Sequence, residues 1–321
     1  MAAFGAIGLA YPARPLVESP LGPERRPAPP PPTVSSVYPS AGAFGRSGAV
    51  QVQFALPGGP VHYPLRLQGD PTSLAYEWER LADSLVPQDQ QVLASDTLTA
   101  PGEPGFYRLT LVRSGMRQVV DGVTLAVLVP FEEKKGSILN GYRIGTYLAE
   151  RSGRRDRDRP EGFVQVVPEV ANLQLTSHLR LGDFLTQDGQ TTWPRYAAVS
   201  SRLLDKVELV VAEVASWRGA GSSALDVRVQ SAFRTPWHNR GVWRAALDSR
   251  HQYGDAVDVA IDANGDGRIT REDSRLVELA VEIVESRFPD LAGGLGLYAG
   301  GAFRHPYVHI DARGTRVRWR A

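Results

Sequence analysis

Residues 249–258 read SRHQYGDAVD, and this stretch decides how the C-terminal half of the chain is interpreted. His251 ends a loop, and Asp258 follows inside a strand predicted over residues 254–261 from its alternating pattern. Gly254 permits a tight bend between the two. The bend can bring an imidazole and a carboxylate together, and zinc accepts both as ligands. A core histidine hydrogen-bonded to an aspartate is the alternative interpretation of the same pair.

A second segment, YVHID at 307–311, places another imidazole, His309, on a predicted strand. His251, Asp258 and His309 together offer two nitrogens and one oxygen. Three protein ligands leave a fourth position for water, which is the arrangement of catalytic rather than structural zinc sites. The chain has six histidines and no cysteine, so any metal site must use His, Asp or Glu.

The elements around these residues mix helices and strands. Apolar residues at helical spacing predict helices over 202–217 and 274–288, and a short strand is expected over 226–230. Because the order lacks a regular βαβ rhythm, the predicted fold class is α+β, with a small antiparallel sheet flanked by helices.

Four ordered motifs occupy this half of the chain. They are SAFRTPWHN at 231–239, SRHQYGDAVD at 249–258, GLGLY at 294–298, and VHID at 308–311 followed by RVRW at 316–319. Over residues 163–321 this order resembles the zinc D-alanyl-D-alanine carboxypeptidase family, within the LAS-type murein peptidases. Residues 177–185 also look like the lead-in helix of that family.

The resemblance implies that His251, Asp258 and His309 are zinc ligands and that Arg234 grips the substrate or its developing oxyanion. Zinc would polarise the scissile carbonyl and lower the pKa of its bound water toward ~7. The planar fork of donors on Arg234 suits a carboxylate or a tetrahedral oxyanion. A structural salt bridge is the alternative role for this arginine.

One position departs from the family pattern. Many members carry an Asp or Glu general base three residues before the last ligand, where this chain has Pro306. His305 and Asp311 are the candidates that remain nearby. Asp311 alternates onto the same strand face as His309, so it is either the base or a partner that fixes the tautomer of a ligand histidine. His305 is expected in a turn at the rim of the cleft.

A second candidate metal site is the segment DANGDGRITRED at 262–273, which follows the template of an EF-hand calcium loop. A strand rather than a helix precedes it, so the loop is EF-hand-like. An ordinary Asn/Gly/Asp-rich turn without metal is the alternative. The predicted calcium ligands are Asp262, Asn264, Asp266, Arg268, Thr270 and Asp273.

The N-terminal half carries no catalytic pattern. Short alternating segments separated by Gly and Pro predict an all-β, sandwich-like domain over 49–130. Its strands are expected near 50–56, 65–67, 107–111 and 123–129. This domain is expected to position the peptidase.

Three further segments complete the predicted organisation. Residues 1–48 are Pro-rich and are expected to be a disordered tether or a trimmed export signal. Residues 131–162 are expected to be a linker, and residues 163–321 the zinc peptidase-like domain. The charged run at 151–160 is expected to be a solvated loop, or else a contact with an anionic wall polymer.

Composition limits the functional classes. The 321 residues suggest two domains, and the net charge of +1 argues against a nucleic-acid or other general polyanion binder. No run approaches the ~20 apolar residues of a membrane span. The absence of cysteine excludes a disulfide scaffold and a cysteine nucleophile.

The sequence therefore predicts an extracytoplasmic, zinc-dependent peptidase that takes peptidoglycan as its partner and hydrolyses peptide bonds containing D-amino acids. An endopeptidase is favoured over a carboxypeptidase. The alternative is a non-catalytic peptidoglycan-binding protein that keeps the peptidase fold, and a calcium-dependent adhesion module is a third hypothesis.

Overall fold

The computed structural model of the chain describes residues 44–62, 74–81, 91–92, 97–113, 115–152, 159–218, 225–300 and 305–321. Three predictions therefore lie wholly or largely outside the described residues: the tether or export signal at 1–48, the strand at 65–67, and much of the charged run at 151–160. Within the described part of the chain, no helix has the length and apolar character that crossing a membrane requires.

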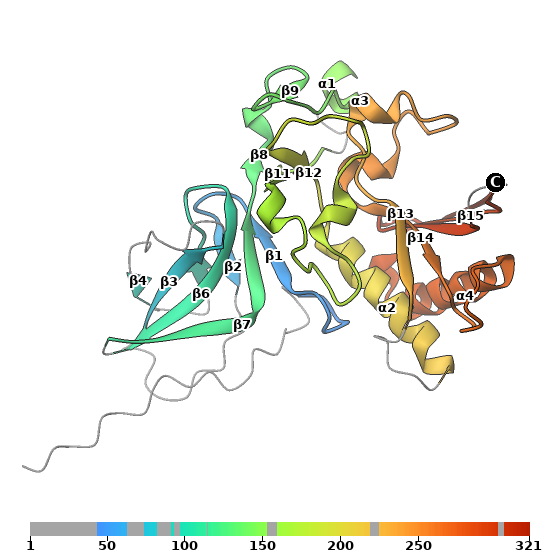
Figure 1. Cartoon of the computed structure of the whole chain (residues 1–321), viewed down its shortest axis with the longest axis horizontal. Helices are drawn as coiled ribbons and strands as arrows, with labels where there is room; N and C mark the ends of the chain where they lie inside the picture. Colours follow the sequence, from blue (N-terminus) through green and yellow to red (C-terminus); the bar gives the residue numbers. More distant parts are fainter. Residues whose placement is uncertain are drawn as a thin grey trace, which may run out of the picture. The chain divides into compact units, whose positions relative to one another are not determined.

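A five-stranded sheet forms the core of the C-terminal half (Figure 1). Its strands lie in the order β13 (Val227–Ser231), β14 (Ala256–Ile261), β16 (Tyr307–Asp311), β15 (Gly294–Tyr298) and β17 (Val317–Arg320). Neighbouring strands are antiparallel, except that β15 and β17 run parallel. The predicted antiparallel sheet is thus present, but its last pair differs in direction.

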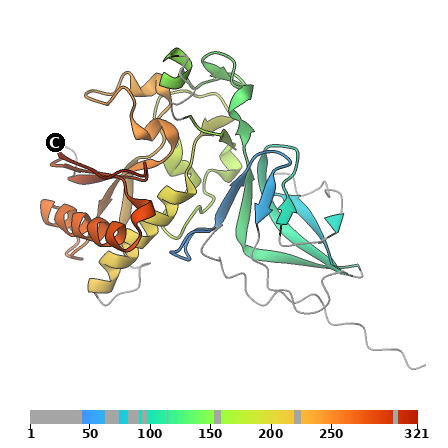
Figure 2. The ribbon, with the colours of Figure 1, turned by 180° about the vertical axis from the view of Figure 1, so that it is seen from behind.

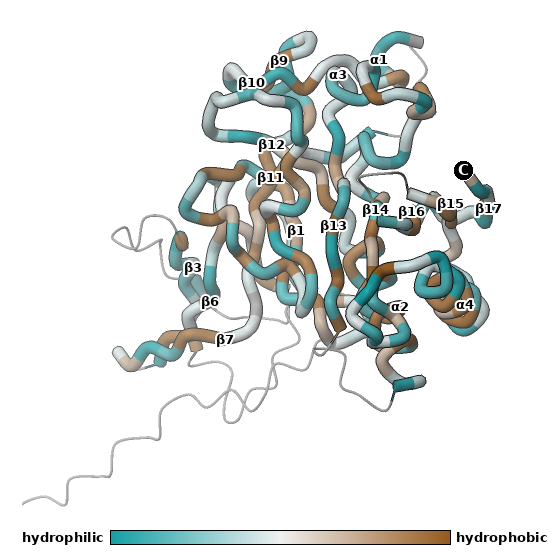
Figure 3. The backbone as a smooth tube through the Cα atoms, turned by 45° about the vertical axis from the view of Figure 1, so that its right-hand side comes forward, coloured by the Kyte–Doolittle hydropathy of each residue, from teal (hydrophilic) through white to brown (hydrophobic). Residues whose placement is uncertain are grey.

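Two helices lie against this sheet, as both views of the ribbon show (Figures 1 and 2). Helix α4 (Arg271–Arg287) packs on β14, β15 and β16, and α2 (Ser201–Trp217) packs against α4. Both helices alternate between hydrophobic and hydrophilic residues along the tube (Figure 3). Val257, Ile310 and Leu295 are cross-strand neighbours and are fully buried, so one face of the sheet is apolar.

Helix α4 begins three residues before the predicted start because a capping box precedes it. The Thr270 hydroxyl accepts a hydrogen bond from the backbone of Glu272, and the Asp273 carboxylate accepts one from the backbone of Thr270. These contacts satisfy amide groups that the first helical turn leaves free. Helix α2 starts at Ser201, one residue from its predicted start.

The N-terminal half is built mainly of strands. A five-stranded sheet has the order β1 (Val52–Ala55), β7 (Met116–Val127), β6 (Gly105–Arg113), β3 (Ala75–Arg80) and β4 (Gln91–Val92). Strands β2 (Pro60–His62) and β5 (Thr97–Thr99) form a separate pair. The strands predicted near 50–56, 107–111 and 123–129 correspond to β1, β6 and β7, whereas the parallel pairing of β1 with β7 was not predicted.

Short elements connect the two halves. Strands β8 (Val129–Pro130), β11 (Gly162–Val166) and β12 (Arg195–Ala197) form a three-stranded sheet, and β9 (Ile138–Leu139) pairs with β10 (Tyr142–Arg143). Two short helices are α1 (Leu148–Ser152) and α3 (Pro236–Asn239). Single 3₁₀ turns lie at Phe131–Glu133, Pro168–Val170, Leu181–Phe184, Arg250–Tyr253 and Pro289–Leu291.

The prediction of a lead-in helix at 177–185 is wrong, because only a 3₁₀ turn at Leu181–Phe184 forms there. The Thr176 hydroxyl accepts hydrogen bonds from the backbone amides of His178 and Leu179. These bonds turn the chain where a helix would have to begin. Taken together, the described residues form a mixed α/β protein that is rich in sheet and has few helices.

Candidate metal centre

The candidate site lies on the second face of the C-terminal sheet. Asp258 on β14, His309 on β16, Gly296 on β15 and Trp319 on β17 are successive cross-strand neighbours. Ser231 on β13 extends the row beyond Asp258. Since residues paired across a sheet point to the same face, this one row places the side chains of four distant segments together.

A turn brings His251 to the row from outside the sheet. The chain makes a single 3₁₀ turn at Arg250–Tyr253 and leaves it at Gly254, whose φ of 70° is the left-handed conformation that favours glycine. A Cβ atom on Gly254 would also lie 2.1 Å from the carbonyl oxygen of Ala198. Gly254 is therefore required both for the turn and for its packing, in agreement with the predicted bend.

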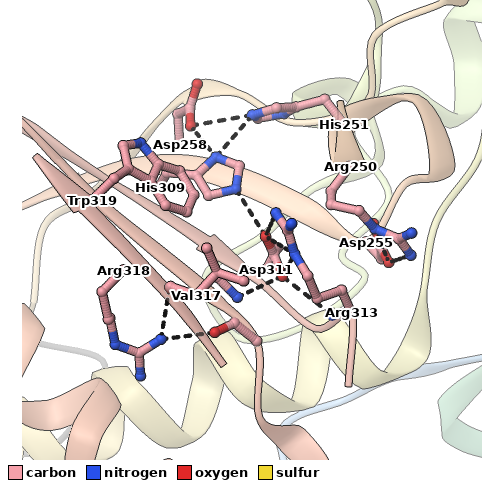
Figure 4. A network of polar contacts seen from close by, with 12 residues as sticks. Arg250, His251, Asp255, Asp258, His309, Asp311, Arg313, Val317, Arg318 and Trp319 are labelled. Carbon is pink, nitrogen blue, oxygen red and sulfur yellow. Dashed lines mark hydrogen bonds and ion pairs between the residues drawn. The ribbon is translucent and has the colours of Figure 1, made fainter. Parts of the chain in front are cut away.

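His251, Asp258 and His309 converge (Figure 4). The distances are 3.1 Å between His251 Nε2 and His309 Nδ1, 2.9 Å between His309 Nδ1 and Asp258 Oδ1, and 3.2 Å between His251 Nε2 and Asp258 Oδ1. Ligands at ~2.1 Å around a tetrahedral ion are about 3.4 Å apart, so these atoms are close to the edges of such a tetrahedron. The donor set and its spacing could therefore hold a metal ion.

The outer nitrogen of each histidine has an acceptor. His251 Nδ1 lies 2.5 Å from the backbone carbonyl oxygen of Ala232, and His309 Nε2 lies 3.2 Å from Asp311 Oδ2. If each outer nitrogen carries the proton and donates it to that acceptor, then His251 Nε2 and His309 Nδ1 present lone pairs to one another and to Asp258. Paired acceptors of this kind orient metal-binding histidines in known sites.

Asp311 is held firmly behind His309. Its side chain is fully buried and accepts hydrogen bonds from the backbone amide of Gly294 at 2.7 Å and from the Arg313 guanidinium. It contacts His309 through Nε2, on the side of the ring away from Nδ1 (Figure 4). Of the two roles considered for Asp311, these contacts favour the tautomer-fixing partner.

The second base candidate, His305, is exposed and lies two residues before β16 begins. Among the residues that the structure describes, it has no hydrogen bond or ion pair with the converging group. Pro306 separates it from the strand. The structure therefore brings His251, Asp258, His309 and Asp311 together and leaves His305 outside the group.

Arg234 contacts the candidate ligands directly. Its Nη2 donates to Asp258 Oδ2 at 2.6 Å, and its Nε donates to Ser231 Oγ at 2.8 Å. Its backbone amide donates to the carbonyl oxygen of His251. The salt bridge considered as the alternative role for Arg234 is thus present, and it leaves Oδ1 of Asp258 facing the two histidines.

Both carboxylates of the group are held in the charged form. Burial raises the pKa of Asp258, but interactions with His251 and His309 outweigh burial and hold this pKa well below its usual range. Burial likewise raises the pKa of Asp311, and hydrogen bonds from His309, Arg313 and the amide of Gly294 outweigh it. Burial lowers the pKa of His251. For His309 burial is outweighed by the two carboxylates, which raise its pKa. Two charged carboxylates thus flank the histidines.

The predicted calcium loop is folded around its own amides. Asp262 accepts hydrogen bonds from the backbone of Gly265 and Gly267, and Asp273 accepts them from Ala263 and Asn264. Within the described part of the chain, His251, Asp258 and His309 are the one group of three His, Cys, Asp or Glu residues whose donor atoms all lie within 4.8 Å of one another. The loop carboxylates are therefore not gathered in this structure, and calcium binding stays a prediction.

Some contributors to the site were absent from the sequence prediction. The contact of Ala232 with His251 is made by the backbone carbonyl oxygen, so the residue type at position 232 gives no indication of it. Arg313 follows Asp311, the last residue of β16, by two positions, and this spacing is a sequence signal for the ion pair that the two residues form. Ser231 stands inside the motif at 231–239, where only Arg234 had been singled out.

No family model matches the chain, and neither a curated protein nor a solved structure matches it. Any assignment of function therefore rests on the geometry of the site and on the motifs.

Proposed function

We propose that this protein is a zinc-dependent peptidoglycan peptidase that hydrolyses peptide bonds containing D-amino acids, acting as an endopeptidase rather than a carboxypeptidase. The observation that carries the proposal is the convergence of His251 Nε2, Asp258 Oδ1 and His309 Nδ1, with acceptors on both outer nitrogens. A closed structural zinc site would use a fourth protein ligand. Three ligands leave a position for substrate or water.

Each residue has a role in this proposal. A zinc ion held by the three side chains would act as a Lewis acid on the scissile carbonyl and make nearby water more acidic. Asp311 fixes the His309 tautomer, and Arg234 holds Oδ2 of Asp258 so that Oδ1 remains available. Asp311 and His305 remain the two candidates for the proton acceptor: Asp311 lies beside His309 but is engaged by the Arg313 guanidinium and the amide of Gly294, whereas His305 is exposed and lies outside the group.

The second candidate function is a non-catalytic peptidoglycan-binding protein with the same fold. Two observations favour it. Pro306 occupies the position of the family's acidic base, and the candidate ligands are only 2–5% exposed. In this alternative the metal would stabilise the fold without turnover.

Digestion of purified sacculi tests the proposal. The zinc-loaded protein should release soluble muropeptides, whose masses identify the bond that is cleaved, and a chelator should abolish the release. His309→Ala should be inactive, whereas His62→Ala, on strand β2, should match the wild type. Binding of sacculi without release by the zinc-loaded wild type would favour the non-catalytic alternative.

Two further parts of the proposal concern the environment of the protein. A peptidoglycan peptidase must act outside the cytoplasm, so we infer an exported protein. We also infer that the loop at 262–273 holds calcium, which is a hard cation served by carboxylate and carbonyl oxygens.

A further inference from the structure

A buried lysine and a buried glutamate link the two helices of the C-terminal half to the end of strand β16. Lys206 on α2 has no exposed side-chain surface, and its Nζ donates to Oε1 of Glu285 on α4 at 2.7 Å. The same Nζ donates to the backbone carbonyl oxygen of Asp311 at 2.7 Å. The ammonium therefore joins both helices to the strand that carries His309.

The glutamate of this pair also holds the start of β15. Glu285 Oε1 accepts a hydrogen bond from the backbone amide of Gly293 at 3.0 Å, and the next amide, that of Gly294, donates to Asp311 Oδ1 at 2.7 Å. These contacts close on themselves, because Asp311 is reached once through its carboxylate and once through its carbonyl. We call the set the lysine ring, and its members are Lys206, Glu285, Gly293, Gly294 and Asp311.

The backbone beside Asp311 is closely packed. A Cβ atom on Gly293 would lie 1.8 Å from the Asp311 carbonyl oxygen, so only glycine fits there. Lys206 and Asp311 are both fully buried. Close-packed interiors transmit a displacement instead of absorbing it. A shift of the Asp311 backbone must therefore also move its carboxylate, which holds His309 Nε2 (Figure 4).

Stability alone does not account for this ion pair. Replacing a buried ion pair with apolar residues of similar volume is often neutral or stabilising, because burial removes the hydration of both charges. Apolar side chains would, however, supply neither a donor for the Asp311 carbonyl nor an acceptor for the Gly293 amide. The pair supplies both, and both lie next to the residue that orients His309.

We propose that Lys206 is a positioning residue for the candidate metal centre: it fixes the end of β16, and through Asp311 it fixes the direction in which His309 Nδ1 points. In this role the lysine touches neither the metal nor the substrate. The inference rests on the function proposed above, because it requires a metal ion at His251, Asp258 and His309. It adds a residue that lies outside the four sequence motifs.

Zinc affinity and thermal stability, measured on the same variants, test the proposal. Competition with a chromophoric chelator gives the Kd for zinc, and circular dichroism gives the Tm of the zinc-free protein. Lys206→Met keeps most of the length of the side chain and removes both hydrogen bonds. It should raise the Kd by about tenfold, the lower end of the range for groups that orient metal ligands. It should also lower the Tm, since Glu285 loses its buried partner.

A second buried lysine provides the matched control. Lys134 Nζ donates to Glu150 Oε1 at 2.6 Å and to the backbone carbonyl of Gly136, and its side chain has no exposed surface either. Lys134→Met therefore breaks the same kind of pair in the segment that connects the two halves. It should lower the Tm and leave the Kd for zinc unchanged.

A double variant separates positioning from stability. Lys206→Met combined with Glu285→Leu removes both charges of the pair, and Arg318, which also contacts Glu285, keeps its ion pair with Glu282. The double variant should regain much of the Tm that the single variant loses. Its zinc binding should stay weak, because the two backbone groups still lack partners. It also tests the proposal if Lys206→Met does not fold.

The outcomes distinguish the two levels of the argument. Failure of the wild type to bind zinc overturns the proposed function and this inference with it. A wild-type Kd in the folded Lys206 variants overturns the inference alone, and so does a raised Kd in Lys134→Met. A double variant that regains both Tm and zinc affinity shows that the pair is only structural. A Kd raised in both Lys206 variants, in a protein that does not digest sacculi, supports the positioning role and counts against the peptidase.

Discussion

At the residue scale, two glycines leave room for larger side chains on a crowded face of the C-terminal sheet. Gly294 and Gly296 are two residues apart on β15, so they face the same side of the sheet, which is the side of the candidate site. Neither has a side chain there. A Cβ atom on Gly294 would lie 2.2 Å from Asp311 Oδ2, and one on Gly296 would meet Trp319. Glycine at positions 294 and 296 thus has a steric cause.

The first prediction concerns Gly296→Ala. The new methyl group must displace the Trp319 indole or the sheet backbone, and overpacking of this kind costs about 1–3 kcal/mol. Thermal unfolding should show a lowered Tm. Gly241→Ala is the control, because its Cβ would meet its nearest neighbour at an ordinary 3.5 Å. Equal Tm values for the two variants would show that the indole yields freely.

A second prediction separates the roles of Asp311 and His305. Asp311→Asn removes the charge that holds His309 Nε2, and such outer-shell changes cost about 10–100-fold in metal affinity or activity. A zinc titration should therefore show weaker zinc binding by Asp311→Asn than by the wild type. His305→Ala should bind zinc normally and lose turnover on sacculi. Digestion of sacculi by His305→Ala at the wild-type rate would leave Asp311 as the remaining candidate base.

The sequence was informative about side chains and silent about backbone partners. The motifs placed His251, Asp258 and His309 in one set, and the three donor atoms do converge. Pairing across the sheet accounts for Asp258 and His309, which lie on adjacent strands, and the turn that ends at Gly254 brings His251 to them. The carbonyl of Ala232 and the amide of Gly294 were beyond prediction, since any residue type supplies them.

At the scale of elements, the calcium loop gives the third prediction. Millimolar calcium should raise the Tm of the zinc-loaded protein, because a ligand at a hundredfold excess over Kd adds about 2.7 kcal/mol to stability. Asp266→Ala should remove the rise. Glu272→Ala, at a loop position that supplies no ligand in the template, should retain it. An unmoved melting curve would identify the segment as a turn held by its own amides.

Strands and helices with clear periodicity were predicted well. The alternation in 254–261 and 307–311 marks β14 and β16, and the apolar spacing in 202–217 marks α2. The parallel pairing of β15 with β17 was missed, because alternation shows which face a residue occupies but not which strand lies beside it. The segment at 177–185 was misread since hydroxyl–amide bonds at Thr176 compete with a helix.

At the scale of the whole molecule, we expect zinc to contribute to folding stability as well as to chemistry. His251 Nε2, His309 Nδ1 and Asp258 Oδ1 are buried within 3.2 Å of one another, and a metal ion bound only in the folded state would take all three as ligands. Saturating zinc should raise the Tm of the wild type by several degrees, since about 1 kcal/mol shifts the Tm of a domain of 150–250 residues by roughly 2–4 °C.

Asp258→Ala provides the comparison for this fourth prediction. The variant lacks the central carboxylate, so it should show no zinc-dependent rise in Tm. His62→Ala retains all three candidate ligands and should show the same rise as the wild type. A rise that persists in Asp258→Ala would place the stabilising ion elsewhere in the molecule.

The row across the sheet also has a consequence for synthesis on the ribosome. Ser231, Asp258, His309, Gly296 and Trp319 become neighbours only through pairings between strands that are far apart in the chain. A nascent chain that has emerged as far as β15 holds His251 and Asp258 but has neither the third donor nor the indole. The full set of three donor atoms proposed to hold zinc therefore exists only after β16 has been translated.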